Sequence, residues 1–234
     1  MKKPILYFLL FSISFANCQK KELRNANKFY NSGEFSSALD ILVANKSLFD
    51  SSDDKIQAQT YLLYGKIYNS QQDFALALES FNKSKDLGIS IDLLTPEISK
   101  LETAIITSAV GDNENDDYST AAYKLKLVYD INPELNQLYL YYAASSAVNS
   151  NDLQLALEYY EVLRDVRYEG IETNFFITEV STGNEIEINS EAEFNILKKS
   201  KDYENPREEE TESRFPEIVK NIALIYKELG QNDR

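Results

Sequence analysis

The chain has 234 residues, a net charge of −14 at neutral pH, one cysteine and no histidine. This composition excludes an internal disulfide, an imidazole general base and a zinc site built from Cys and His. The acidic balance argues against nucleic acid and anionic lipid surfaces as partners, because both require clusters of Lys and Arg.

Residues 1–18 have the pattern of an export signal. Lys2 and Lys3 form a positively charged start, and the apolar run PILYFLLFSISF that follows is too short for an anchored membrane-spanning helix. Two kinds of processing remain open. A signal peptidase would cut close to Cys18, or Cys18 would itself become the lipidated first residue of a lipoprotein, although Asn17 departs from the small residue expected before such a cysteine. In either case we expect the protein to leave the cytoplasm.

A spacing of small and aromatic residues recurs along the rest of the chain. Gly65 lies twelve residues before Ala77, Phe74 lies three before it, and Phe81 lies four after it. Small residues let two helix backbones approach closely, and the aromatic rings fill the space beside them. The same spacing is found around three further alanines, Ala38, Ala121 and Ala156.

This spacing resembles that of tetratricopeptide repeats, which are helix-turn-helix units of 34 residues. The resemblance covers residues 19–170 and implies an all-α, right-handed superhelical solenoid of four repeats, at about 19–52, 58–91, 96–134 and 137–170. The segment SLFDSSDDK connects the first repeat to the second, and the third needs a lengthened turn. Such solenoids bind a protein or peptide in a concave groove that the first helices of the repeats line.

Five residues on these first helices are expected to face the concave groove: Asn27, Tyr30, Lys66, Asn69 and Tyr141. A tyrosine at such a position offers a peptide a rigid apolar face and one hydroxyl group. Packing between helices is the alternative role for the same side chains.

The acidic stretch at residues 111–119 alternates carboxylates as a calcium loop does. However, Asp117 stands where such a loop needs glycine, and Tyr123 stands where it needs a closing glutamate. We therefore interpret the stretch as a solvated turn and expect neither a metal nor a cofactor. An enzyme such as a glycosidase would need two carboxylates in a cleft. No carboxylate here has a Gly-rich or aromatic setting that suggests one, so we expect a protein that is not an enzyme.

The repeat pattern stops at residue 171. TNFFITEV and EIEIN alternate apolar and polar residues around a Gly-Asn turn, which predicts a small β-hairpin. A short helix capped by Ser190 and a polar loop follow. An insertion of this kind at 171–215, followed at 216–234 by the first helix of a fifth, incomplete repeat, resembles a subgroup of exported bacterial tetratricopeptide repeat proteins.

The last predicted helix has more apolar surface than one neighbouring helix can bury, and Leu224 and Ile225 belong to that surface. It indicates self-association, docking on another subunit, or a chain that is part of a longer repeat protein. The favoured interpretation is an interaction scaffold, periplasmic or associated with the outer membrane of a Gram-negative bacterium, with a protein or peptide partner that the sequence does not identify. The alternative is a structural subunit of an envelope or outer-membrane assembly complex, anchored by a lipid on Cys18.

Overall fold

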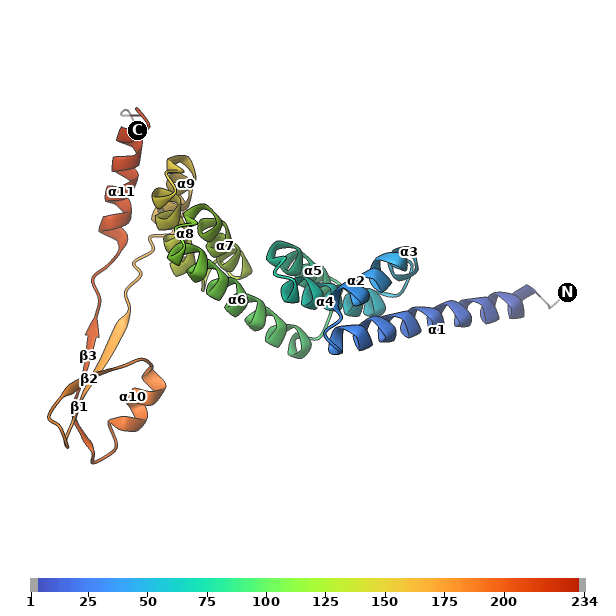
Figure 1. Cartoon of the computed structure of the whole chain (residues 1–234), viewed down its shortest axis with the longest axis horizontal. Helices are drawn as coiled ribbons and strands as arrows, with labels where there is room; N and C mark the ends of the chain where they lie inside the picture. Colours follow the sequence, from blue (N-terminus) through green and yellow to red (C-terminus); the bar gives the residue numbers. More distant parts are fainter. Residues whose placement is uncertain (1–3, 232–234) are drawn as a thin grey trace. The chain divides into compact units, whose positions relative to one another are not determined.

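The computed structural model describes residues 4–231, and of residues 4–17 it describes the backbone alone. Lys2 and Lys3, the charged start of the expected export signal, lie outside the described residues. The chain is mostly helical and separates into two compact units, Met1–Ser150 and Asn151–Arg234 (Figure 1). Each unit has its own packing and is described by itself.

The first unit contains eight of the helices in the described range. They are α1 (Pro4–Asn31), α2 (Phe35–Ala44), α3 (Lys46–Asp50), α4 (Asp54–Ser70), α5 (Phe74–Asp86), α6 (Ile91–Glu114), α7 (Tyr118–Ile131) and α8 (Gln137–Asn149). Packing follows the order of the chain, with α1 against α2, α4 against α5, α6 against α7, and α7 against α8. Helices that pack in this way on their sequence neighbours are compatible with a helical-repeat solenoid.

The pair α4–α5 shows how the recurring small residues act. Gly65 is buried on α4, and a Cβ atom added to it would stand 2.4 Å from two ring carbons of Phe81 on α5. The hydroxyl of Ser84 donates a hydrogen bond of 2.7 Å to the carbonyl of Ala58 and links the same two helices. The absence of a side chain at Gly65 is therefore what lets the helices approach.

The alanines of the recurring spacing are also completely buried, which explains why only small residues occur there: Ala26, Ala38, Ala77, Ala121, Ala144 and Ala156. Around them the first unit has two apolar clusters. One joins α1–α4 and the other joins α4–α7 together with the start of α8.

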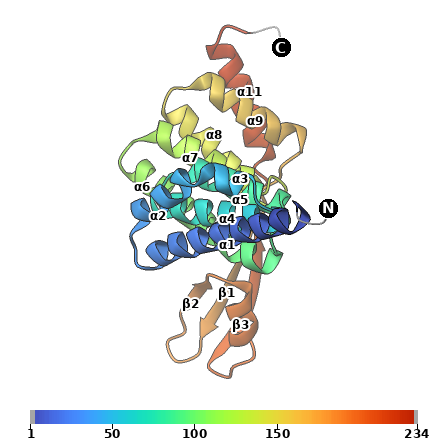
Figure 2. The same ribbon diagram turned by 90° about the vertical axis from the view of Figure 1, so that its right-hand side faces the viewer.

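The second unit is built on two helices, α9 (Leu153–Asp165) and α11 (Phe215–Glu228), which lie side by side (Figures 1 and 2). α11 buries the stripe Ile218, Ile222 and Ile225, whose spacing of four and three residues places them on one face. Asn221 Nδ2 donates to the hydroxyl of Tyr160 on α9 at 3.3 Å.

Between these helices the chain forms a three-stranded antiparallel sheet in the order β2-β1-β3. The strands are β1 (Thr173–Glu179), β2 (Glu185–Ile188) and β3 (Tyr203–Glu210). α10 (Glu191–Leu197) begins at Ser190, whose side chain accepts from the Glu193 N–H as the sequence predicted. Phe194 on α10 packs with Ile177 and Ile188 in a small core of its own.

The third strand corrects the sequence analysis, which predicted a hairpin alone and assigned residues 203–210 to a polar loop. β3 pairs with the backbone of β1 along its length, and such pairing needs no apolar alternation. Two of its side chains also pack: Tyr203 lies against the small core of Ile177, Ile188 and Phe194, and the Arg207 guanidinium lies 4.4 Å from the ring centroid of Phe176 and pairs with Glu185. Backbone pairing and these two side chains thus hold a segment whose composition is that of a solvated loop.

Candidate functional site

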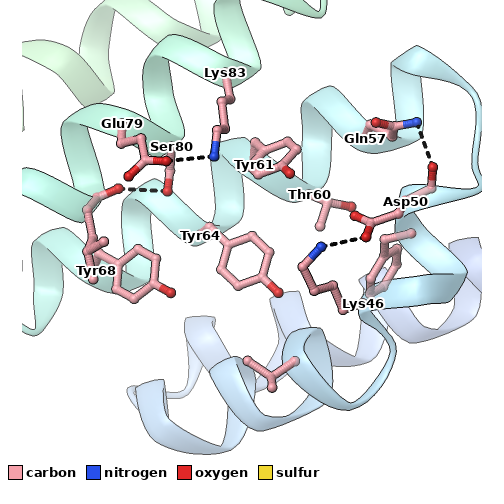
Figure 3. Close-up of a pocket in the computed structure, with 13 residues that line it drawn as sticks. Lys46, Asp50, Gln57, Thr60, Tyr61, Tyr64, Tyr68, Glu79, Ser80 and Lys83 are labelled. Atoms are coloured by element: carbon pink, nitrogen blue, oxygen red, sulfur yellow. Dashed lines mark hydrogen bonds and ion pairs between the residues drawn. The ribbon is translucent and has the colours of Figure 1, made fainter.

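A groove opens in the first unit, with α2 and α3 on one side, α5 on the other, and α4 as its floor (Figure 3). It encloses a cavity of about 290 Å³. We call it the tyrosine groove, and its lining residues are Val43, Lys46, Phe49, Asp50, Gln57, Thr60, Tyr61, Tyr64, Tyr68, Leu76, Glu79, Ser80 and Lys83.

The floor of the groove is a row of three aromatic rings. Tyr61, Tyr64 and Tyr68 follow one another at intervals of three and four residues on α4, so they share one helix face. The ring centroids of Tyr61 and Tyr64 are 6.1 Å apart, and those of Tyr64 and Tyr68 are 5.9 Å apart with the rings nearly parallel. This row presents apolar ring surface together with hydroxyl groups.

Each wall of the groove carries one ion pair. On α3, Lys46 pairs with Asp50 at 2.5 Å, and on α5, Lys83 pairs with Glu79 at 2.6 Å. In each pair the lysine and the carboxylate are four residues apart on the same helix. Because their charges cancel, each wall is electrically neutral. Two exposed apolar side chains, Val43 of α2 and Leu76 of α5, also line the groove and are 58% and 45% exposed.

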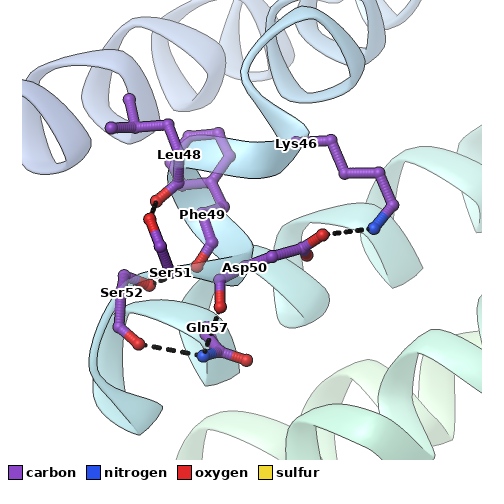
Figure 4. A network of polar contacts seen from close by, with 7 residues as sticks. All are labelled: Lys46, Leu48, Phe49, Asp50, Ser51, Ser52 and Gln57. Atoms are coloured by element: carbon purple, nitrogen blue, oxygen red, sulfur yellow. Dashed lines mark hydrogen bonds and ion pairs between the residues drawn. The ribbon is translucent and has the colours of Figure 1, made fainter.

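A hydrogen-bond network holds α3 in place as a wall (Figure 4). The hydroxyl of Ser52 donates to the carbonyl of Phe49 at 2.6 Å and closes the turn after α3. Gln57 Nε2, on the first turns of α4, donates to the carbonyls of Ser52 at 2.9 Å and of Asp50 at 3.2 Å. The wall is thereby fixed to the start of the floor helix.

The groove favours the protonated form of two of its tyrosines, Tyr64 and Tyr68. Burial raises the pKa of Tyr64 to about 12, with smaller contributions from Tyr68, Tyr61 and Asp50. Burial also raises the pKa of Tyr68, with the negative charges of Asp73 and Glu79 adding to the effect. At neutral pH these hydroxyls are therefore neutral groups that can donate hydrogen bonds to a ligand.

The raised pKa of Tyr64 predicts how the stability of the chain changes at alkaline pH. From pH 10 to about 12 the folded chain keeps this proton while the unfolded chain releases it, so rising pH favours unfolding across the interval. We expect the free energy of unfolding to fall more steeply there in the wild type than in Tyr64→Phe. Denaturant unfolding at intervals across this range measures both slopes, and equal slopes would contradict the burial of the Tyr64 hydroxyl.

None of the five residues predicted for the concave groove lines the tyrosine groove. Two of them meet elsewhere, because Lys66 Nζ on α4 lies 4.8 Å from the ring centroid of Tyr30 on α1. Asn27 donates to the carbonyl of Leu23 on its own helix at 2.9 Å. Asn69 has a buried Oδ1 atom without a hydrogen-bond partner in the described range.

Tyr141 lies apart from these four on α8 and is only 7% exposed. Its burial contradicts the accessible position that the sequence analysis expected and favours the alternative of packing between helices. The repeat spacing was a poor guide at this position because it identifies the helix face but not what covers that face.

Of the three remaining predicted positions, two are exposed and one is buried. Cys18 is exposed on α1. Leu224 is 51% exposed on α11. Ile225 is buried, because it completes the apolar stripe of α11, and the expectation that it forms part of an open surface is wrong.

The tyrosine groove itself escaped the sequence analysis. The sequence analysis treats SLFDSSDDK as a connection only and assigns no binding role to Tyr61, Tyr64 or Tyr68. The available signal was the regular spacing of Tyr61, Tyr64 and Tyr68, which places three aromatic side chains on one face of the same predicted helix.

No protein-family model matches the chain, and no curated protein matches it. Within residues 4–231 no group of three or more Cys, Asp or Glu side chains is placed to hold a metal ion. Asp112, which the sequence analysis assigned to a turn, lies near the end of α6 and pairs with Lys124 of α7 at 2.6 Å. Over the same residues no helix has the length and apolar character needed to cross a membrane.

Proposed function

We propose that this chain is a tetratricopeptide-type repeat scaffold that binds a segment of a partner protein in the tyrosine groove. The observation that carries the proposal is the open row of three tyrosine rings between two neutral walls. Tyrosine is enriched where proteins bind one another, because it combines a rigid apolar face with one hydroxyl group. The helix pairs and their buried small residues support the scaffold class.

The groove suits an amphipathic helix. Tyr61, Tyr64 and Tyr68 form a stripe with the same intervals as the apolar stripe of an amphipathic helix, and such helices bind by laying that stripe in a groove. The walls add a constraint on charge, since Lys46 and Lys83 are each already paired with a carboxylate. A polyanionic ligand would have to compete with these pairs, whereas an uncharged apolar stripe leaves them intact.

This groove lies along α2 and α5, the second helices of the first two predicted repeats. Its floor, α4, is a first helix, but its lining contains none of the five residues predicted for the concave surface, and of those five Lys66 contacts the ring of Tyr30 instead. We further propose that the scaffold works in the bacterial envelope, and the support for this is the sequence of residues 1–18.

A site-specific crosslinking experiment tests the proposal. Benzoylphenylalanine placed at Leu76, inside the groove, should crosslink in cells to one discrete partner on illumination. The matched position is Val110, an exposed apolar residue on α6 outside the groove. A peptide from the crosslinked segment should then bind the purified chain, and Tyr61→Ala should weaken that binding by about 30-fold, as loss of an interface hot spot does.

The control for affinity is Tyr123→Ala, which removes an exposed tyrosine of α7 outside the groove. Equal crosslinking from Leu76 and Val110, or an equal loss of affinity in the two tyrosine variants, would refute binding in the groove. Circular dichroism of each variant separates lost binding from lost folding.

A structural subunit of an envelope assembly is the second candidate, and the exposed Val219 and Leu224 on α11 favour it. The crosslinking experiment distinguishes the two functions when Leu224 is included as a third position. Crosslinks from Leu224 alone would support docking through α11, whereas crosslinks from Leu76 alone would support the groove.

A further inference from the structure

The exposed side of α1 carries a run of cations directly after Cys18. Lys20, Lys21, Arg24 and Lys28 occupy it. At 3.6 residues per turn their side chains fall within an arc of about 100° around the helix axis. Glu22, the acidic residue of this stretch, lies on the other side of the helix, where it accepts a hydrogen bond from Asn25 at 3.2 Å.

A fifth cation reaches the same region from another helix. Lys55, at the start of α4, lines a hollow of about 430 Å³ together with Lys20 and Arg24 of α1. The carboxylate in this hollow, Asp53, is engaged as the N-cap of α4 and accepts from the Ile56 N–H at 2.9 Å. We call the five cations the basic face: Lys20, Lys21, Arg24, Lys28 and Lys55.

The cations of the basic face are not neutralised by the protein. Within the part of the chain that the structure describes, none of the five forms an ion pair, whereas Lys46, Lys83 and Lys124 all do. All five side chains are exposed. A chain of net charge −14 thus gathers a set of unpaired positive charges at one end of its first unit.

We propose that the basic face binds the anionic surface of a phospholipid membrane. The total charge of the chain argues against such a partner. However, at physiological salt the electrostatic interaction of an exposed charge is largely screened beyond about 8 Å, so the charges close to the membrane determine whether it is attracted. Each Lys or Arg at an anionic membrane contributes roughly fivefold in affinity. The exposed Cys18 adjoins this face, so membrane contact here is compatible with either processing of residue 18.

Vesicle partitioning of the full chain tests the proposal. Phosphatidylcholine vesicles are compared with vesicles that also contain phosphatidylglycerol. The apolar run of residues 4–17 is the same in every variant. The difference in partition coefficient between the two vesicle types therefore measures the electrostatic contribution to membrane binding. We expect Lys20→Gln with Arg24→Gln to lower the partition coefficient on anionic vesicles by about 25-fold and to leave that on neutral vesicles unchanged.

The matched control is Lys199→Gln with Lys201→Gln, which removes the same charge from exposed positions of the second unit. An equal loss in this control would overturn the proposal, because net charge rather than the basic face would then govern binding. A partition coefficient that does not change with the phosphatidylglycerol content of the vesicles, or with added salt, would also overturn the proposal. So would displacement by inorganic phosphate at equal phosphate concentration, or tighter binding of poly-glutamate than of vesicles.

Discussion

Replacing Gly65 by alanine should destabilise the first unit by about 1–3 kcal/mol, as insertion of a methyl group into a packed core does. The added Cβ atom would stand 2.4 Å from Cδ1 and Cε1 of Phe81. The ring has no free space to move into, because Phe81 is completely buried. Gly111→Ala should do the opposite, since no atom beyond its own turn of α6 lies within 4 Å of the added Cβ atom, and alanine favours a helix by up to about 1 kcal/mol.

Denaturant midpoints of the two glycine variants measure this contrast, and both glycines lie within helices, α4 and α6. An unchanged or raised midpoint for Gly65→Ala would contradict the close approach of α4 and α5. A double variant adds specificity. If Gly65→Ala acts by collision with the ring, its cost should shrink when Phe81→Leu is already present, which a double-mutant cycle detects.

Tyr141→Ala should cost about 3 kcal/mol of stability, because it empties the space of a large buried side chain. The neighbouring Tyr142, which is 39% exposed, offers a matched control on the same helix, and Tyr142→Ala should cost no more than about 1 kcal/mol. Thermal unfolding of the two variants distinguishes a packing role of Tyr141 from an accessible position. An unchanged melting temperature for Tyr141→Ala would restore the original expectation of an accessible groove residue.

The pairing of the helices could be predicted from the sequence because it depends on residues close together in the chain. A position like Gly65 must be small wherever two neighbouring helices touch, and the constraint recurs at Ala38, Ala77 and Ala121. Periodicity of this kind needs no knowledge of distant contacts.

The site could not be predicted in the same way. One wall of the tyrosine groove is α3, a helix of five residues, and so short a segment has no periodicity to detect. The burial of Tyr141 and Ile225 depends on which other helices cover their helix faces, and the residue pattern within one helix does not contain that information. Likewise β3 has the composition of a solvated loop, and its strand conformation follows from its pairing with β1.

The two outer strands of the sheet have a consequence for the behaviour of the protein at high concentration. An unpaired strand edge can recruit the same edge of another molecule and begin a fibril. Here β3 contains Pro206, which has no N–H to offer, and exposed carboxylates at Glu204, Glu208, Glu209 and Glu210. On the opposite edge, β2 exposes Glu185 and Glu187. Arg207 compensates Glu185 and Glu209, but within the described residues Glu187, Glu204, Glu208 and Glu210 form no ion pair. Two copies brought edge to edge would set these like charges against one another, which protects the sheet from growing by strand addition.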